Sequence, residues 1–251
     1  MAEITRRKAM TMLAVTAVGG AMLPRAALAQ NAALITGADV CVITPEVTEG
    51  PFYFDPALVR PDITEGRPGL RVRLRLQVVD QLCAPMANAR VDVWHCDAEG
   101  NYSGYDNKTP RETFMRGTQM TGTDGVAEFA TVYPGWYRGR TTHIHFKVFL
   151  DETNVLTGQI FFPDEISEQI YASVPPYNAH SGRDTFNEED GIARQAGTAS
   201  VATVSTIEEG YDVAMIVGVD PNHVSAGFGG APGGMGGPPP DGAMSFPLTN
   251  G

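Results

Sequence analysis

The sequence predicts an all-β domain, a sandwich or barrel with one or two short helices and long loops. Residues 71–78 alternate polar and apolar side chains, as a strand does when one of its faces lies in water. Further short runs of strand character follow, separated by turn signals such as Thr-Asp-Gly at 123–125 and Tyr-Pro-Gly at 133–135. Several short strands with such punctuation favour a sandwich or barrel over an α/β fold.

The predicted strands follow one another along most of the chain. Before the first of them, residues 30–70 show no clear periodicity. One short helix is predicted near residues 164–172, where Asp164 can cap the first turn. No internal repeat is evident, so we expect a single domain. The strands are expected at residues 71–78, 89–96, 126–132, 143–150, 155–162 and 211–219.

The two ends of the chain differ in composition from the middle. Residues 1–29 combine a basic start, an apolar run and a small-x-small cleavage site at 27–29, and the adjacent Arg6 and Arg7 indicate a twin-arginine signal peptide. A permanent transmembrane helix is disfavoured because the apolar run is short and contains two glycines. We therefore expect an exported protein, periplasmic or secreted. Its parts would be a signal peptide at 1–29, a sandwich domain at 30–225 and a loose Gly/Pro-rich tail at 226–251.

The charge of the chain limits its partners. The formal net charge is −11, and removing residues 1–29 leaves 14 basic and 28 acidic residues, a net charge of −14. Such a surface disfavours nucleic acid and anionic lipid as partners. We expect a soluble protein that acts on a small molecule, with no membrane association after signal removal. The sequence leaves a homo-oligomer open.

Three cysteines are present, Cys41, Cys83 and Cys96. In an oxidising compartment they can form one disulfide and leave one thiol, but the spacing does not decide the pairing. A cysteine-based zinc site is less favoured because no two of them form a Cys-x-x-Cys pair.

Two histidines mark the most informative segment. His143 and His145 lie two residues apart on the predicted strand 143–150, so both side chains leave the same face and can point at one atom. Tyr137 lies just upstream, and Tyr102 follows a Gly-containing turn after another predicted strand. Together the four side chains would form a donor set of two imidazoles and two phenols.

The chemistry of this donor set favours one metal. A free phenol has a pKa of about 10, so it binds a metal at neutral pH only when a strong Lewis acid removes its proton. Fe(III) is small, hard and triply charged, and it does this well. Zinc prefers His, Cys and carboxylate ligands, and Fe(II) oxygenases favour two His with one carboxylate.

Three segments, 44–53, 91–106 and 133–147, resemble the intradiol ring-cleavage dioxygenases, the protocatechuate and catechol 1,2-dioxygenase family. The most specific part is Tyr-Pro-Gly-Trp-Tyr followed by Arg-x-x-His-Ile-His. The resemblance covers most of residues 41–220. It implies a β-sandwich core, an aromatic diol and O2 as substrates, and ring cleavage between the two hydroxylated carbons to a muconate-type product.

The resemblance also implies a mononuclear non-haem Fe(III), with a water or hydroxide completing its shell. Tyr137 matches the axial tyrosinate that leaves the iron when a catechol binds and accepts a substrate proton. Tyr102 and His145 match the equatorial ligands, and His143 matches the second axial ligand.

Further residues match family positions around the metal. Arg140 matches the arginine whose charge stabilises the carbanion-like substrate that meets O2, and Gln159 matches a glutamine near the substrate. Because an odd offset separates Arg140 from His143, we expect the strand to begin at or after Thr142, with Arg140 in the preceding loop. A stretch resembling the pocket entrance comprises Gly50, Pro51, Phe52 and Tyr53.

Two other functions are weighed against this interpretation. A transthyretin-like β-sandwich could keep the motif as a binding or structural module, but a scaffold has no need of four ligands and Arg140. A zinc hydrolase is a weak alternative, because no carboxylate lies at ligand spacing from the histidine pair. Two features depart from the family pattern: little room precedes the first strand for the N-terminal helical segment of catechol dioxygenases, and nothing reveals the second chain with which protocatechuate enzymes pair. The exported form resembles an extracytoplasmic branch of the family, so the choice among catechol, protocatechuate and hydroxyquinol stays open.

Overall fold

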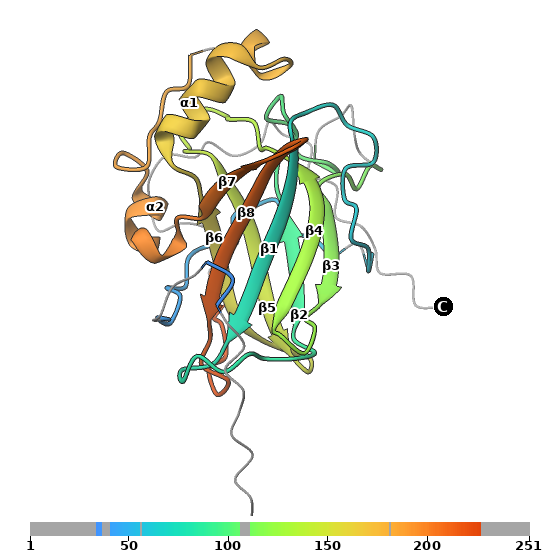
Figure 1. Cartoon of the computed structure of the whole chain (residues 1–251), viewed down its shortest axis with the longest axis vertical. Helices are drawn as coiled ribbons and strands as arrows, with labels where there is room; N and C mark the ends of the chain where they lie inside the picture. Colours follow the sequence, from blue (N-terminus) through green and yellow to red (C-terminus); the bar gives the residue numbers. More distant parts are fainter. Residues whose placement is uncertain (1–33, 37–40, 56, 106–110, 181, 227–251) are drawn as a thin grey trace, which may run out of the picture. The chain divides into compact units, whose positions relative to one another are not determined.

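The computed structural model describes residues 34–36, 41–55, 57–105, 111–180 and 182–226. Within them, two four-stranded β-sheets are stacked face to face (Figure 1). The first sheet has the order β4 (Val126–Val132), β1 (Arg71–Val79), β8 (Gly210–Gly218) and β7 (Thr203–Ile207). The second has the order β3 (Arg116–Met120), β2 (Arg90–Trp94), β5 (His143–Leu150) and β6 (Thr153–Phe161). The predicted all-β sandwich is confirmed.

The core lies between the two sheets. Val72, Leu74 and Leu76 point inward from β1, as the alternation of residues 71–78 predicts, and meet Val91 of β2 and Ile144 of β5. Most neighbouring strands run antiparallel, but β1 and β8 run parallel. Because parallel neighbours need a long connection, the chain builds the second sheet and its helices before β8 returns to β1.

The second sheet is buried on both faces. Ile144 of β5 enters the core, whereas His143 and His145 lie on the opposite face and are also buried. The described residues 41–55, here called the covering segment, pass over that outer face: Gly50 lies next to His145, Tyr53 packs on Trp94, and Glu49 pairs with Lys147. The covering segment thus creates a second, polar interior in which two histidines are shielded from water.

Six strands and one helix lie close to their predicted positions. The helix α1 (Asp164–Ser173) matches the prediction near 164–172, but the expected capping by Asp164 is wrong. Pro163 takes the N-cap position without a side-chain hydrogen bond, while Asp164 pairs with Arg183 and accepts from the backbone N–H of Asn187. The sequence patterns did not reveal β3, β7, α2 (Gly191–Ala196) or the two 3-10 helices, η1 (Tyr177–Ala179) and η2 (Thr198–Ser200).

A disulfide joins Cys41 to Cys83, and the thiol of Cys96 is free and buried. The bridge ties the covering segment to the turn after β1. No helix within the described ranges is long and apolar enough to cross a bilayer. The signal peptide predicted at 1–29 and all but the first residue of the tail predicted at 226–251 lie outside these ranges.

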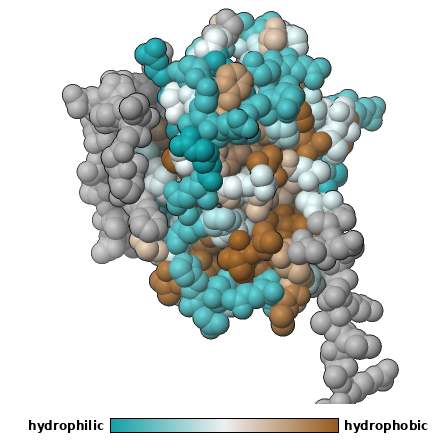
Figure 2. Space-filling view, turned by 90° about the vertical axis from the view of Figure 1, so that its left-hand side faces the viewer, coloured by the Kyte–Doolittle hydropathy of each residue, from teal (hydrophilic) through white to brown (hydrophobic). Residues whose placement is uncertain are grey.

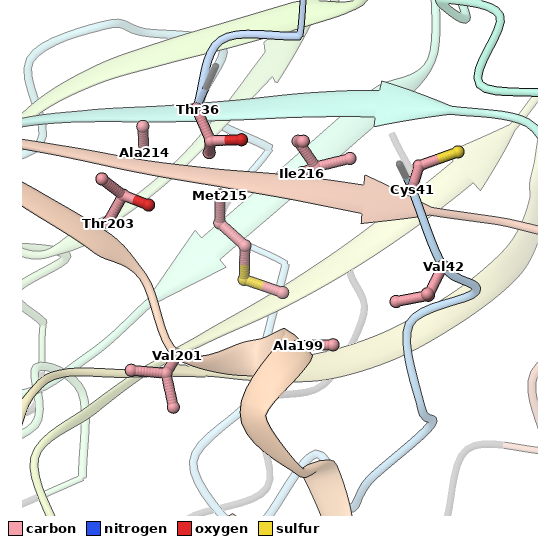
Figure 3. A pocket seen from close by; sticks show the side chains of 9 residues that line it. All are labelled: Thr36, Cys41, Val42, Ala199, Val201, Thr203, Ala214, Met215 and Ile216. Atoms are coloured by element: carbon pink, nitrogen blue, oxygen red, sulfur yellow. The ribbon is translucent and has the colours of Figure 1, made fainter. Parts of the chain in front are cut away.

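A hollow lies beside β8, η2 and the start of the covering segment (Figure 3). Its lining mixes apolar side chains, such as Met215, Val42 and Val201, with the hydroxyls of Thr36 and Thr203 (Figure 3). The view from the left-hand side of Figure 1 shows apolar side chains at the surface (Figure 2). None of the sequence-predicted site residues lines this hollow.

Candidate metal centre

Strand β5 supplies two imidazoles that point at each other. Its first residue is His143, which confirms that the strand begins after Thr142 and that Arg140 belongs to the preceding loop. The Nε2 atoms of His143 and His145 lie 3.1 Å apart. Only 2 % of His143 and 1 % of His145 is exposed.

Two loops each bring one phenol close to the Nε2 of His143. Tyr137 arrives on the loop between β4 and β5, and its Oη lies 3.0 Å from the Nε2 of His143. Tyr102 arrives on the connection between β2 and β3, and its Oη lies 3.4 Å from the same nitrogen. The structure therefore brings together all four side chains that the sequence analysis proposed as ligands.

Close backbone packing holds these two loops together. The Asp97 carboxylate accepts from the backbone N–H groups of Glu99 and Asn101, which shapes the turn before Tyr102. Gly100 has a φ of +86°, and a Cβ there would meet the Trp136 carbonyl at 2.5 Å. Only glycine permits both the left-handed backbone and this approach. The contact between Gly100 and Trp136 thus joins the two loops, and this joint positions both phenols.

Arg140 links the centre to the surrounding chain. Its Nη1 lies 3.3 Å from the Nε2 of His143, and its Nη2 donates to the Oε1 of Gln159 at 2.6 Å. Gln159 lies opposite His145 on β6, and its Nε2 donates to the Thr48 carbonyl at 2.9 Å. Arg140 and Gln159 therefore both lie beside the four side chains.

The predicted pocket stretch divides into two halves. Phe52 stacks on Tyr102 with ring centroids 4.2 Å apart, and a Cβ on Gly50 would lie 3.4 Å from the His145 ring. Tyr53 instead turns away, packing on Trp94 and donating to the Asp92 carboxylate at 3.0 Å. Pro51 is exposed. Gly50 and Phe52 flank the centre, whereas Tyr53 helps to fix the covering segment.

Burial keeps the two imidazoles neutral. It lowers the pKa of His143 to about 3, with the Arg140 charge adding to the effect, and it lowers the pKa of His145 well below its ordinary value. The Nδ1 of His143 lies 2.6 Å from the Thr141 carbonyl, which can only accept, so Nδ1 carries the proton and Nε2 a lone pair. Trp94 stacks on the His145 ring at 4.9 Å and fixes its orientation.

Burial also keeps the two phenols protonated in the absence of a metal. It raises the pKa of Tyr137 to about 12 against the opposing charge of Arg140, and it raises the pKa of Tyr102 well above 10. Only a strong Lewis acid would convert such phenols to phenolates at neutral pH.

The donor set fits a hard, highly charged cation. The single lone pair on the Nε2 of His143 faces Tyr102, Tyr137, Arg140 and His145 within 3.4 Å, and it cannot satisfy all four. A cation coordinated by the two imidazole nitrogens and the two phenol oxygens would give all four donor atoms a partner. In the part of the chain that the structure describes, no three His, Cys, Asp or Glu side chains gather as a metal site.

Comparison with known proteins identifies the family of the chain. A family model described as dioxygenase matches residues 48–176, about half of the chain. The solved structure of an intradiol ring-cleavage dioxygenase from Tetranychus urticae is 34% identical with a TM-score of 0.70, and the match covers 74% of this chain and 98% of that one. The chain belongs to the intradiol ring-cleavage dioxygenase family.

Two further relatives share less sequence identity with this chain. The dioxygenase domain of a dioxygenase and carbohydrate-binding protein fusion from Streptomyces sp. SirexAA-E is 27% identical with a TM-score of 0.56, over 71% of this chain and 99% of that one. Chlorocatechol 1,2-dioxygenase from Rhodococcus opacus is 28% identical over 47% of this chain and 56% of its own length. The chain spans about half the length of the curated relatives it matches.

The sequence analysis of this intradiol family member missed one residue of the centre. Asp190 accepts from the Nε of Arg140 at 2.8 Å and from the backbone N–H of Thr141 at 3.0 Å. It lies 50 residues beyond Arg140, beside two exposed glutamates, and nothing in the local pattern separates it from them. Its burial follows only from the fold, and the helix that it caps has six residues, too few to show a helical period in the sequence.

Proposed function

We propose that the protein is a non-haem Fe(III) dioxygenase. It would insert both atoms of O2 into a catechol-type aromatic diol and cleave the ring between the hydroxylated carbons, giving a muconate-type dicarboxylic acid. The observation that carries the proposal is the convergence of two phenols and two neutral imidazoles beside a buried guanidinium. Fe(III) would be held by Tyr102, Tyr137, His143 and His145.

When bound there, Fe(III) would supply the Lewis acidity that deprotonates the phenols and draws electron density from the diol. Tyr137 is the more accessible of the two phenols, since Tyr102 is fully buried. A phenolate oxygen at this position could act as a base toward a bound diol. It would take a proton from one diol hydroxyl, so that the O–H bond of the substrate breaks and that of Tyr137 forms.

Arg140 would stabilise negative charge on the deprotonated diol. Its guanidinium is buried beside the donor set, where a fixed positive charge acts more strongly than in water. Gln159 holds one edge of that guanidinium and joins it to Thr48 of the covering segment. Phe52, stacked on Tyr102, and Gly50, next to the His145 ring, would border the side of the centre where a diol binds.

The test uses purified protein loaded with ferric iron. We expect a burgundy-red colour from tyrosinate-to-iron charge transfer, a colour change when a catechol is added, and uptake of one O2 per diol. Catechol, protocatechuate and hydroxyquinol should be compared, with the dicarboxylic product measured by mass spectrometry. Colourless protein at full iron occupancy would contradict the proposal. Binding of a catechol without O2 uptake would instead indicate a transthyretin-like binding module.

We also propose that the protein is exported and works in the periplasm or outside the cell. The basic and apolar segment at 1–29 supports this, and so does the Cys41–Cys83 disulfide, because such bonds persist in oxidising compartments. The test is the N-terminal sequence of the protein recovered from the periplasm or medium. A chain that retains Arg6 and Arg7 in the cytoplasm would overturn the proposal.

A further inference from the structure

The carboxylate of Asp190 caps α2 with one oxygen and binds Arg140 and Thr141 with the other. Asp190 is the N-cap of α2 and only 3 % exposed. Its Oδ1 accepts from the backbone N–H groups of Ile192 at 2.8 Å and Ala193 at 3.2 Å. Its Oδ2 accepts from the Nε of Arg140 at 2.8 Å and the backbone N–H of Thr141 at 3.0 Å. Both oxygens are fully used by the protein, so the carboxylate cannot rotate without breaking two hydrogen bonds.

This arrangement fixes the plane of the Arg140 guanidinium. Asp190 holds its Nε, and Gln159 accepts from its Nη2 at 2.6 Å. Because the guanidinium is planar, holding its Nε and Nη2 also fixes the direction of its third nitrogen. That nitrogen, Nη1, lies 3.3 Å from the Nε2 of His143, at the edge of the donor set.

Arg140 and Asp190 also neutralise each other's charge in a buried site. The side chains of Arg140 and Asp190 are 11% and 2% exposed, and an isolated guanidinium at that depth would carry a large desolvation penalty. The Arg140 charge, against the effect of burial, holds the pKa of the Asp190 carboxyl below its usual range. The two groups therefore stay ionised together in a buried site.

We propose that Asp190 is a positioning residue, whose carboxylate anchored on α2 directs the Nη1 of Arg140 toward the substrate side of the four-donor centre. Asp190 does not touch the proposed metal ligands itself. The inference rests on the proposed function for its effect on turnover, but the orientation of Arg140 can be measured without it.

The main variant is Asp190→Asn. The retained Oδ1 can still accept from Ile192 and Ala193, so the cap of α2 is kept, whereas the new amide nitrogen cannot accept from Arg140. Asp190→Ser is a second variant, since serine is also a good N-cap but is too short to reach Arg140. Glu188→Gln is the control, because it removes the same charge from an exposed position in the same loop.

The first measurement uses metal-free protein and does not depend on activity. The Arg140 Nε–H should exchange slowly with solvent in the wild type and in Glu188→Gln, as seen by nuclear magnetic resonance, and rapidly in both Asp190 variants. Slow exchange in either Asp190 variant would overturn the proposal.

The second measurement uses the iron-loaded protein and a catechol. Both Asp190 variants should keep the iron content and colour of the wild type, because the four donors are untouched. Their kcat should fall roughly 10- to 100-fold with KM changed less than about threefold, as expected for an interaction made mainly in the transition state. Under anaerobic conditions the catechol-induced visible band should move to longer wavelength, since the bound diol loses a facing positive charge.

Two other outcomes decide against the inference. Loss of iron and colour together with activity would show that Asp190 supports the donor set itself. An equal loss of kcat in Glu188→Gln would show a general effect of charge. If the wild type itself takes up no O2, the proposed function fails, and the Arg140 exchange measurement still decides the positioning role.

Discussion

Two phenols four residues apart on one loop have different surroundings. Tyr137 lies 3.0 Å from the Nε2 of His143. Tyr133 is fully buried in the core, where its hydroxyl pairs with Ser167 at 2.7 Å and its ring packs on Phe162. Neighbouring residues of one type on one loop can thus serve chemistry and packing separately.

Replacing each tyrosine by phenylalanine separates these roles. Tyr137→Phe should remove most of the tyrosinate colour, lower the iron content and reduce O2 uptake by at least about 100-fold, because it deletes both a donor and a base. Tyr133→Phe should keep colour and activity and lower the free energy of unfolding by about 1 kcal/mol, the usual cost of one hydrogen bond. Visible spectra, iron analysis and urea unfolding measure these effects. Equal losses of colour in the two variants would show that the ligand is assigned wrongly.

The residues of the centre were predictable to different degrees. His143 and His145 could be paired from their spacing on a strand, because that geometry is local. Tyr102 needed the resemblance to a family, since a tyrosine after a turn is common. Asp190 could not be found, because its partner Arg140 is 50 residues away and only the fold brings them together.

At the scale of secondary structure, the predictions failed where the apolar signal was weak. β3 begins with Arg116, whose side chain is buried, so its pattern does not look like that of a half-buried strand. β7 is an edge strand whose residues are mostly exposed. The helix α2 has six residues, too few to show a helical period. Strands with a strong apolar face, such as β1 and β5, were predicted close to their bounds.

The joint between the two tyrosine-bearing loops can be tested with a pair of glycines. Gly100 and Gly66 have φ values of +86° and +74°, so alanine is strained by roughly 1 kcal/mol at either position. A Cβ on Gly100 would meet the Trp136 carbonyl at 2.5 Å, whereas a Cβ on Gly66 meets nothing within 4 Å. Gly100→Ala should therefore lower iron content and colour as well as stability, and Gly66→Ala should lower stability alone. Iron per chain and the melting temperature measure both, and full iron loading of Gly100→Ala would refute the role of this joint.

At the scale of the whole sandwich, the two histidines of the centre lie on the outer face of the second sheet, away from the apolar core. The space between the sheets holds the apolar cluster that includes Leu74, Phe129 and Phe146. The covering segment, tied down by the Cys41–Cys83 disulfide, closes the other side of the second sheet. Buried histidines on a sheet face must then remain neutral at physiological pH, which couples the stability of the metal-free protein to pH.

His95 offers a direct measure of that coupling, because it is fully buried but belongs to no proposed ligand set. Its Nδ1 lies 2.7 Å from the Cys96 carbonyl and its Nε2 lies 2.8 Å from the Thr131 hydroxyl, which suits the neutral ring. Burial lowers its pKa to about 4, and the Arg116 charge adds to this against the hydrogen bond to Cys96. The unfolded chain has the ordinary histidine pKa of about 6.5 and binds the proton first as the pH falls.

The stability contributed by neutral His95 should therefore be complete above about pH 6.5 and decline as the pH falls toward 4. In metal-free protein, the difference in unfolding free energy between the wild type and His95→Gln should shift against the wild type by on the order of 3 kcal/mol over that range. His143 and His145 titrate in both proteins, so the subtraction removes their contribution. Urea unfolding at pH 7, 5.5 and 4 provides the measurement. A difference that stays constant with pH would show that folding does not depress the pKa of His95.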